Sequence, residues 1–77
     1  MKPRKLALSP TQTAIVWLLE EAGEEDMRTI KASVKAGDEE LAREIAALER
    51  IQFVHSTVVD GWPALLLTAQ GRAALSM

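Results

Sequence analysis

The stretch that decides the fold spans residues 39–72 and reads EELAREIAALERIQFVHSTVVDGWPALLLTAQGR. In its first part the apolar residues recur every three or four positions, which is the period of one face of an α-helix. These residues are Leu41, Ile45 and Leu48. We therefore expect a helix from Glu39 to about Ile51 with one buried face.

The second part of this stretch predicts a β-hairpin followed by a short helix. Residues 53–59 are rich in β-branched side chains and residues 62–67 are apolar, so each segment favours a strand. Asp60-Gly61 lies between them and tolerates the positive φ that a tight hairpin turn requires. Pro63 has no N–H to donate, so we expect it on an edge strand or in the turn. Thr68 is expected to begin a last short helix, where Gly71 indicates close packing or an early end.

A first helix is predicted upstream. Ser9 can cap it, Pro10 suits the first helical position, and Gln12 completes a capping box. Its apolar face comprises Ile15, Leu18, Leu19 and Ala22, and Gly23 favours a left-handed end. Trp17 lies beside that face, so we expect it to be half-buried against another helix.

A second helix is predicted from Met27 to about Ala36. Its outward residues Arg28, Lys31 and Lys35 are spaced by three and four, so they form one basic stripe. An acidic cluster precedes it, where negative charge suits a helix N-terminus, and it comprises Glu20, Glu21, Glu24, Glu25 and Asp26. Gly37 permits a turn, and Asp38 is expected to cap the third helix.

Composition bounds the class of protein. The 77 residues carry 48% hydrophobic residues and a net charge of −2, as expected for one small folded domain, residues 1–77, rather than a disordered chain. Residues 1–7 are expected to form a flexible basic arm. The chain contains no cysteine, which fits a reducing compartment, and no apolar run approaches the roughly 20 residues of a membrane span. We expect a cytoplasmic protein, and so small a core favours a homodimer.

Together these elements predict an α+β fold, a small winged helix-turn-helix with three helices, a two-stranded β-hairpin wing and a short C-terminal helix. Leu48-Glu49-Arg50, Phe53-Val54 and Leu67-Thr68-Ala69-Gln70-Gly71-Arg72 carry a resemblance to the winged helix-turn-helix domains of MarR- and PadR-type regulators. The likeness covers residues 39–75. The chain departs from the family pattern at Gln52, where glycine is usual, so the helix is expected to end without that left-handed residue. It also departs in the wing, which has no Arg or Lys between His55 and Leu67.

The resemblance implies a bacterial or phage-type transcriptional regulator that binds double-stranded DNA. It would place Glu39, Glu40, Arg43, Ala46 and Ala47 towards the major groove, with Arg43 as the main base contact and Arg50 on the DNA backbone. Further phosphate contacts are expected from the basic stripe and from the terminal arm. Those candidates are Arg28, Lys31, Lys35, Lys2, Arg4 and Lys5.

The acids of the third helix support an alternative. Asp38, Glu39, Glu40 and Glu44 are all expected on its outward side, where they would repel phosphates. The alternative is a protein-interaction module that does not bind DNA. In it Glu40 and Glu44 would meet a basic partner, and Val58 with Trp62 would form an apolar anchor.

No pattern of catalytic residues is present. The chain has no Ser/His/Asp or Cys/His set and no glycine-rich phosphate loop, so we expect no enzyme. His55 is the only histidine, and a lone histidine without cysteines does not predict a metal site. The acidic cluster lacks the ligand spacing of a calcium loop, so no metal or cofactor is expected.

Overall fold

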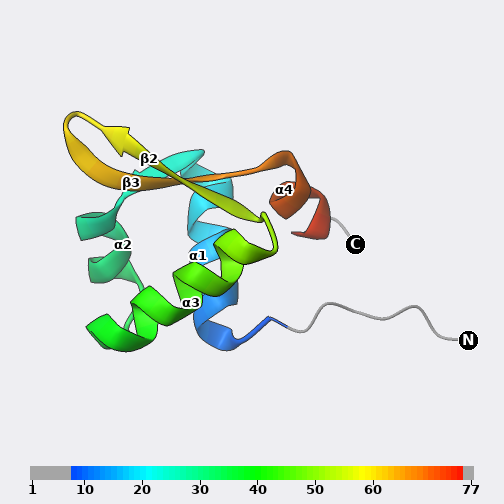
Figure 1. The fold of residues 1–77 in the computed structure, drawn as a ribbon, viewed down its shortest axis with the longest axis horizontal. Helices are drawn as coiled ribbons and strands as arrows, with labels where there is room; N and C mark the ends of the chain where they lie inside the picture. Colours follow the sequence, from blue (N-terminus) through cyan, green and yellow to red (C-terminus); the bar gives the residue numbers. More distant parts are fainter. Residues whose placement is uncertain (1–7, 76–77) are drawn as a thin grey trace, which may run out of the picture.

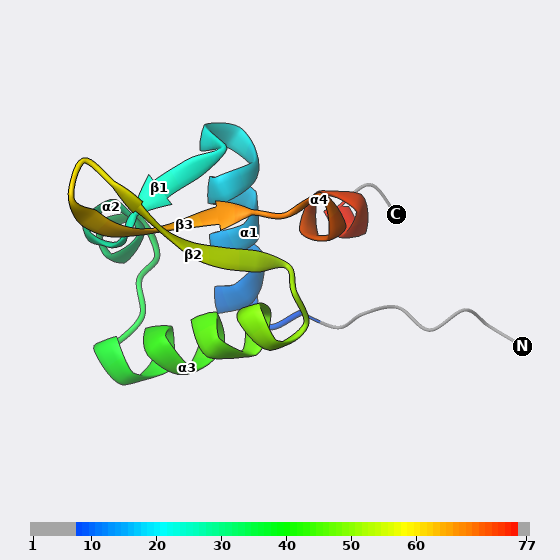
Figure 2. The ribbon, with the colours of Figure 1, turned by 45° about the horizontal axis from the view of Figure 1, so that its top comes forward.

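The computed structural model describes residues 8–75, in which helices pack on one face of a three-stranded sheet (Figures 1 and 2). The elements in chain order are α1 (Pro10–Ala22), β1 (Glu24–Asp26), α2 (Met27–Ser33), α3 (Asp38–Arg50), β2 (Val54–Val59), β3 (Trp62–Leu67) and α4 (Ala69–Leu75). The predicted α+β winged helix-turn-helix, with its hairpin wing and C-terminal helix, is confirmed. The term wing is used below for the β2–β3 hairpin, residues 54–67.

The ends of α1 form as the sequence predicts. The Ser9 hydroxyl accepts a hydrogen bond from the Gln12 backbone N–H at 3.1 Å, and the Gln12 side chain accepts one from the Ser9 N–H at 2.9 Å. Gly23 ends the helix with a φ of 84°. Trp17 remains 51% exposed on this helix, so no neighbouring helix in the described part of the chain covers its ring fully.

The sheet contains a third strand, β1, that the sequence did not predict. Glu24–Asp26 pairs antiparallel with the stretch Ala64–Leu66 of β3, which gives the strand order β1-β3-β2. This segment is part of the acidic cluster, and Asp26 also caps α2 by accepting the Thr29 N–H at 3.0 Å. The carboxylate expected near the start of α2 is therefore present, but the residues before it form a strand.

Pro63 lies on the central strand, so the expectation of an edge strand or turn is wrong. It pairs with Val58 of β2, and the partner of Asp26 is Ala64, so β1 ends one position before reaching Pro63. In a hairpin with a two-residue turn, Val59 and Trp62 form the hydrogen-bonded pair and the next pair does not exchange N–H bonds. At position 63 a backbone N–H would point towards the β1 side of β3, but β1 has already ended there. Proline therefore costs no hydrogen bond between the described strands.

Both helix ends that flank the turn of the helix-turn-helix differ from the prediction, and the connection, residues 34–37, is longer than expected. Helix α2 ends at Ser33 instead of Ala36, so Lys35 lies in the connection and the basic stripe of the helix is limited to Arg28 and Lys31. The residue that caps α3 is Gly37, which has no side-chain hydrogen bond to offer, and Asp38 is the first helical residue. The predicted cap by Asp38 is therefore wrong, because its carboxylate pairs with Lys31.

Helix α3 ends with Gln52 in the left-handed region at a φ of 65°. The Phe53 N–H donates to Leu48 O at 2.9 Å and the Gln52 N–H donates to Glu49 O at 3.0 Å, which is the Schellman pattern of a helix C-terminus. The expectation that this end would close without a left-handed residue is wrong. Glutamine occupies the conformation that glycine favours, because Leu48 and Phe53 are both buried and fix the chain on either side.

The core contains one face of each long helix and the inner face of the sheet. Its fully buried large side chains are Ile15, Val16, Leu19, Ile30, Leu48, Val54 and Leu65. Helix α4 closes one end, where a Cβ on Gly71 would collide with the Phe53 carbonyl oxygen and lie 2.8 Å from Leu67 Cδ1. The close packing expected at Gly71 is confirmed. The helix also continues to Leu75, so the glycine does not end it early.

Candidate nucleic-acid interface

Helix α3 exposes a continuous stripe to solvent. Its exposed residues recur every three or four positions, as one face of a helix requires. They are Asp38, Glu39, Ala42, Arg43, Ala46, Glu49 and Arg50. Among residues 8–75, no acid lies within ion-pair distance of Arg43 or Arg50. The stripe therefore presents two guanidinium groups that have no acidic partner in this part of the chain. Ala46 and Glu49 lie between them, and Glu49 accepts a hydrogen bond from Ser56 Oγ at 2.6 Å.

Two acids expected on that stripe face α1 instead. Glu40 accepts a hydrogen bond from Thr11 Oγ1 at 2.9 Å, and Glu44 accepts one from Gln12 Nε2 at 2.8 Å. Glu44 also accepts a longer bond, 3.3 Å, from Ser9 Oγ. The expected outward orientation of Glu40 and Glu44 is thus wrong. Both carboxylates are half-buried between helices, because the capped N-terminus of α1 supplies hydrogen-bond donors there.

A third acid is paired across the turn between α2 and α3. Lys31 Nζ lies 2.6 Å from Asp38 Oδ1, and both side chains are more than half exposed. An exposed pair of this kind adds little stability, about 0–1 kcal/mol, but it balances the charge at the start of α3. Of the four acids expected to repel DNA, Glu39 alone projects from the stripe without a partner in the described residues.

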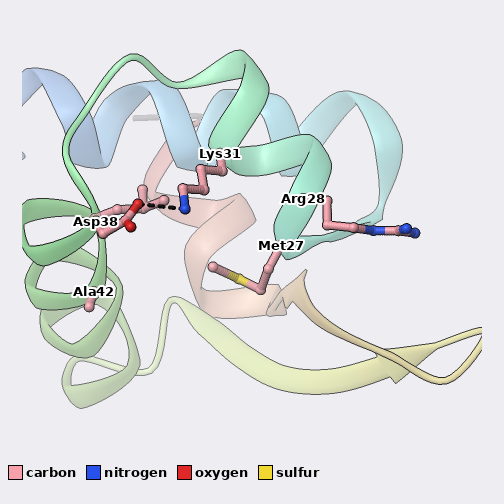
Figure 3. A pocket seen from close by; sticks show the side chains of 6 residues that line it. Met27, Arg28, Lys31, Asp38 and Ala42 are labelled. Carbon is pink, nitrogen blue, oxygen red and sulfur yellow. Dashed lines mark ion pairs between the residues drawn. The ribbon is translucent and has the colours of Figure 1, made fainter.

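An open groove of about 360 Å³ lies between α2 and α3 (Figure 3). Met27, Arg28 and Lys31 line it from α2, and Asp38, Leu41 and Ala42 line it from α3. Figure 3 shows Lys31 reaching Asp38, while Arg28 extends in the opposite direction. The groove therefore places the Lys31 ammonium group beside the first turn of α3, whereas the Arg28 side chain points away from α3.

The other predicted residues are spread more widely. Lys35 is exposed in the connection after α2, and Ala47 is half-buried, so Ala42 and Ala46 are the alanines that α3 exposes. Arg50 is exposed at the last position of the helix. Lys2, Arg4 and Lys5, with the basic arm they belong to, lie outside the described residues.

The wing carries two exposed apolar residues on opposite faces. Val58 is 66% exposed and Trp62 is 47% exposed. Val58 pairs with Pro63, on the face that carries the buried Val54 and Leu65, whereas Trp62 pairs with Val59 on the other face. The two side chains therefore do not form the single anchor that the protein-interaction alternative expects.

Sequence reasoning missed the contact that Trp62 makes. The guanidinium carbon of Arg28 lies 3.8 Å from the centre of the Trp62 ring, which is cation–π distance. Arg28 Nε is also 3.5 Å from Asp26 Oδ1. The two residues are far apart in the sequence and no local pattern links them. They meet because the β1–β3 pairing sets the start of α2 beside the first residue of β3.

The pKa of Asp26 lies below its usual value of 3.8. The main cause is the hydrogen bond from the Thr29 backbone N–H, which stabilises the ionised carboxylate, and the nearby Arg28 charge acts in the same direction. Within residues 8–75, no group of three His, Cys, Asp or Glu side chains is placed to hold a metal ion. Every helix in this part of the chain is too short or too polar to traverse a lipid bilayer.

The fold and this surface define a winged helix-turn-helix domain, and comparison with known proteins agrees. No protein-family profile and no curated protein matches the chain. A MarR-family transcriptional regulator from Silicibacter pomeroyi superposes with a TM-score of 0.79 at 21% identity over 90% of this chain. BpsR of Bordetella bronchiseptica superposes over the same share with a TM-score of 0.78 at 16% identity. The BpsR structure describes how 6-hydroxynicotinic acid regulates the DNA binding of BpsR.

These similarities establish the fold as that of the winged-helix domain of MarR-type regulators. The chain spans about half the length of each similar protein, 48% of the Silicibacter regulator and 51% of BpsR.

Proposed function

We propose that this chain binds double-stranded DNA as a winged-helix transcriptional regulator, with the exposed stripe of α3 in the major groove. The observation that carries the proposal is the orientation of the acids. Glu40 and Glu44 are bonded to α1, and Asp38 is paired with Lys31, so of the four acids expected to repel DNA Glu39 alone remains beside Arg43 without a partner in the described residues.

Each side chain then has a role that its chemistry suits. Arginine makes two hydrogen bonds to the guanine edge, and an alanine methyl group can contact the methyl group of thymine. We assign the base contacts to Arg43, with Ala42 and Ala46 beside it. Phosphate contacts are assigned to Arg28, Lys31, Lys35 and Arg50, and to the terminal residues Lys2, Arg4 and Lys5.

Binding to DNA as a homodimer is part of the proposal. Two copies would place two α3 helices on half-sites about one helical turn of DNA apart, which is the usual geometry of this motif. A DNA-binding role also agrees with the cytoplasmic location expected from the sequence. Light scattering of the purified chain, with and without a duplex, measures the stoichiometry directly.

The test is a titration of a labelled DNA duplex at several salt concentrations. If all seven assigned residues contact phosphates, we expect the logarithm of the affinity to fall with the logarithm of salt with a slope of about −6 per bound chain. Arg43→Ala should weaken binding about fivefold to 150-fold, since a good base contact is worth about 1–3 kcal/mol.

The matched control is Arg72→Ala, which removes the same charge from α4, at the end of β3 opposite the tip of the wing (Figures 1 and 2). Arg72 bonds to Glu20 at 3.0 Å, so the folded state of this variant is checked by thermal unfolding before the titration. The absence of duplex binding by the unaltered chain at low salt would refute the proposal. The alternative, a protein-binding module, would then rest on the exposed Val58 and Trp62 alone.

A further inference from the structure

The wing of this protein carries no positive charge of its own. Residues 54–67 contain no lysine or arginine, and the turn at its tip carries an acid, Asp60. A hairpin of this composition has no lysine or arginine whose charge would attract a DNA phosphate. The nearest source of positive charge is Arg28, whose guanidinium lies over Trp62, the first residue of β3.

The stacking geometry leaves the hydrogen-bonding edge of Arg28 available. A guanidinium that stacks on an aromatic ring uses its flat face, and its five N–H donors point outward in the plane. Asp26 approaches the Nε side at 3.5 Å, which is longer than a strong charged hydrogen bond. The contact with Asp26 involves Nε, and the side chain is 60% exposed, so the two terminal nitrogens are the donors that a phosphate could reach with two parallel hydrogen bonds.

Two restraints hold the guanidinium in this place. The Trp62 ring centre lies 3.8 Å from the guanidinium carbon, and the carboxylate of Asp26, which caps α2, attracts Nε from 3.5 Å. The arginine side chain is still 60% exposed, so a ligand can reach it. A long side chain restrained before binding loses less conformational freedom on contact than a free one.

From this geometry we propose that Arg28 supplies the phosphate contact of the wing, and that Trp62 is the positioning residue that holds it there. The inference rests on the proposed DNA-binding function and adds to it the chemistry of one contact. The ligand is a phosphate of the DNA backbone, bound by both terminal nitrogens of Arg28 beside the hairpin. Trp62 acts through Arg28 and donates nothing to the phosphate.

The experiment is a double-mutant cycle on the full chain, measured as duplex affinity over a range of salt concentrations. We expect Arg28→Gln to weaken binding five- to twentyfold and to reduce the salt slope by about 0.9, which corresponds to one lost phosphate contact. Trp62→Leu should weaken binding about threefold to tenfold in the unaltered chain. In the Arg28→Gln background it should change affinity less than twofold.

Two conservative variants separate positioning from a general effect on folding. Trp62→Phe keeps an aromatic face under the guanidinium and should retain affinity within about twofold. Arg28→Lys keeps the charge but loses the planar fork, so it should bind more weakly than the unaltered chain at the same salt slope. Thermal unfolding of each variant confirms that the compared chains are folded.

Two outcomes would overturn the inference while leaving the proposed function intact. One is duplex binding by Arg28→Gln with unchanged affinity and salt slope. The other is an effect of Trp62→Leu that is as large in the Arg28→Gln background as in the unaltered chain. Failure of the unaltered chain to bind any duplex would instead refute the proposed function itself. A Trp17→Phe variant leaves Trp62 as the only tryptophan, and its fluorescence should change when the duplex is added.

Discussion

The side-chain amide of Gln12 donates a hydrogen bond to Glu44 Oε1 at 2.8 Å, which ties a carboxylate of α3 to the first turn of α1. The same Gln12 completes the capping box of α1 through its Oε1. One side chain thus joins the start of α1 to the middle of α3. The bond directs a negative charge of α3 inward, away from the stripe that carries Arg43.

This bond predicts different effects for two acids of the same helix. Glu44→Ala removes bonds to Ser9 and Gln12, so it should lower the free energy of unfolding by about 1–2 kcal/mol. Glu39→Ala removes the same charge from the exposed stripe and should change stability by less than about 0.5 kcal/mol. Urea denaturation of both variants measures the difference. Equal effects on stability would contradict the interhelical role of Glu44.

Glu39→Ala should also strengthen duplex binding, because Glu39 is exposed on the α3 stripe without a partner in the described residues, whereas Glu49 accepts a hydrogen bond from Ser56. The expected gain is about twofold to fivefold at low salt, and it should shrink as salt is added, since exposed charges are screened. Duplex titration at two salt concentrations measures it. An unchanged affinity would place the start of α3 away from the DNA.

The left-handed conformation of Gln52 predicts a stabilising substitution. A non-glycine residue at positive φ costs about 1 kcal/mol, so Gln52→Gly should raise the free energy of unfolding by roughly 0.5–1 kcal/mol. Gln52→Ala is the matched control, because alanine meets the same backbone cost and should give no gain. Thermal and urea unfolding test both variants. A loss of stability in Gln52→Gly would show that contacts of the glutamine side chain stabilise the fold by more than the left-handed backbone conformation destabilises it.

The close approach at Gly71 predicts a destabilising substitution. Gly71→Ala forces a methyl group against the Phe53 carbonyl and Leu67, which should cost about 1–3 kcal/mol. Gly37→Ala is the control, because a Cβ at Gly37 meets nothing within 4 Å and its φ of −68° suits any residue. Because Gly37 also caps α3 and alanine is the poorer cap, we expect Gly37→Ala to cost up to about 1 kcal/mol, less than the clash at Gly71. Equal losses in the two variants would mean that α4 shifts to accept the methyl group.

The lowered pKa of Asp26 predicts how its contribution depends on pH. Because the pKa of Asp26 is lower in the folded chain, its ionised carboxylate stabilises the fold at pH values above the usual pKa of 3.8. This contribution is lost as the pH falls through the pKa of the folded chain. Asp26→Asn keeps a residue that caps helices but does not titrate. The unaltered chain should therefore be more stable near neutral pH, and the difference should narrow below the usual pKa. Denaturation of both chains at several pH values measures the difference in their free energies of unfolding. A difference that does not change with pH would refute the prediction.

The sequence predicted those parts of the fold whose signal is local. The spacing of Leu41, Ile45 and Leu48 identifies α3, and Asp60-Gly61 identifies the turn of the wing. Strand β1 was missed because Glu24-Glu25-Asp26 has little strand preference of its own, and pairing with distant residues of β3 makes it a strand.

The candidate site was predicted less well, for the same reason. Whether Glu40 and Glu44 point to solvent or to α1 depends on donors supplied by a helix far away in the sequence. The stacking of Arg28 on Trp62 likewise depends on how β1 positions the start of α2. Residue spacing predicted which side chains share a helix face, but it could not predict which neighbouring element that face would meet.

Strand β1 also limits how two copies of this chain can associate. It is an edge strand, and unpaired edges are the places where sheets of separate molecules join. All three of its residues are acidic, so two such edges brought side by side would crowd like charges and repel each other. A continuous intermolecular sheet through β1 is therefore disfavoured near neutral pH, and the subunit contact of the proposed homodimer has to be formed elsewhere on the surface.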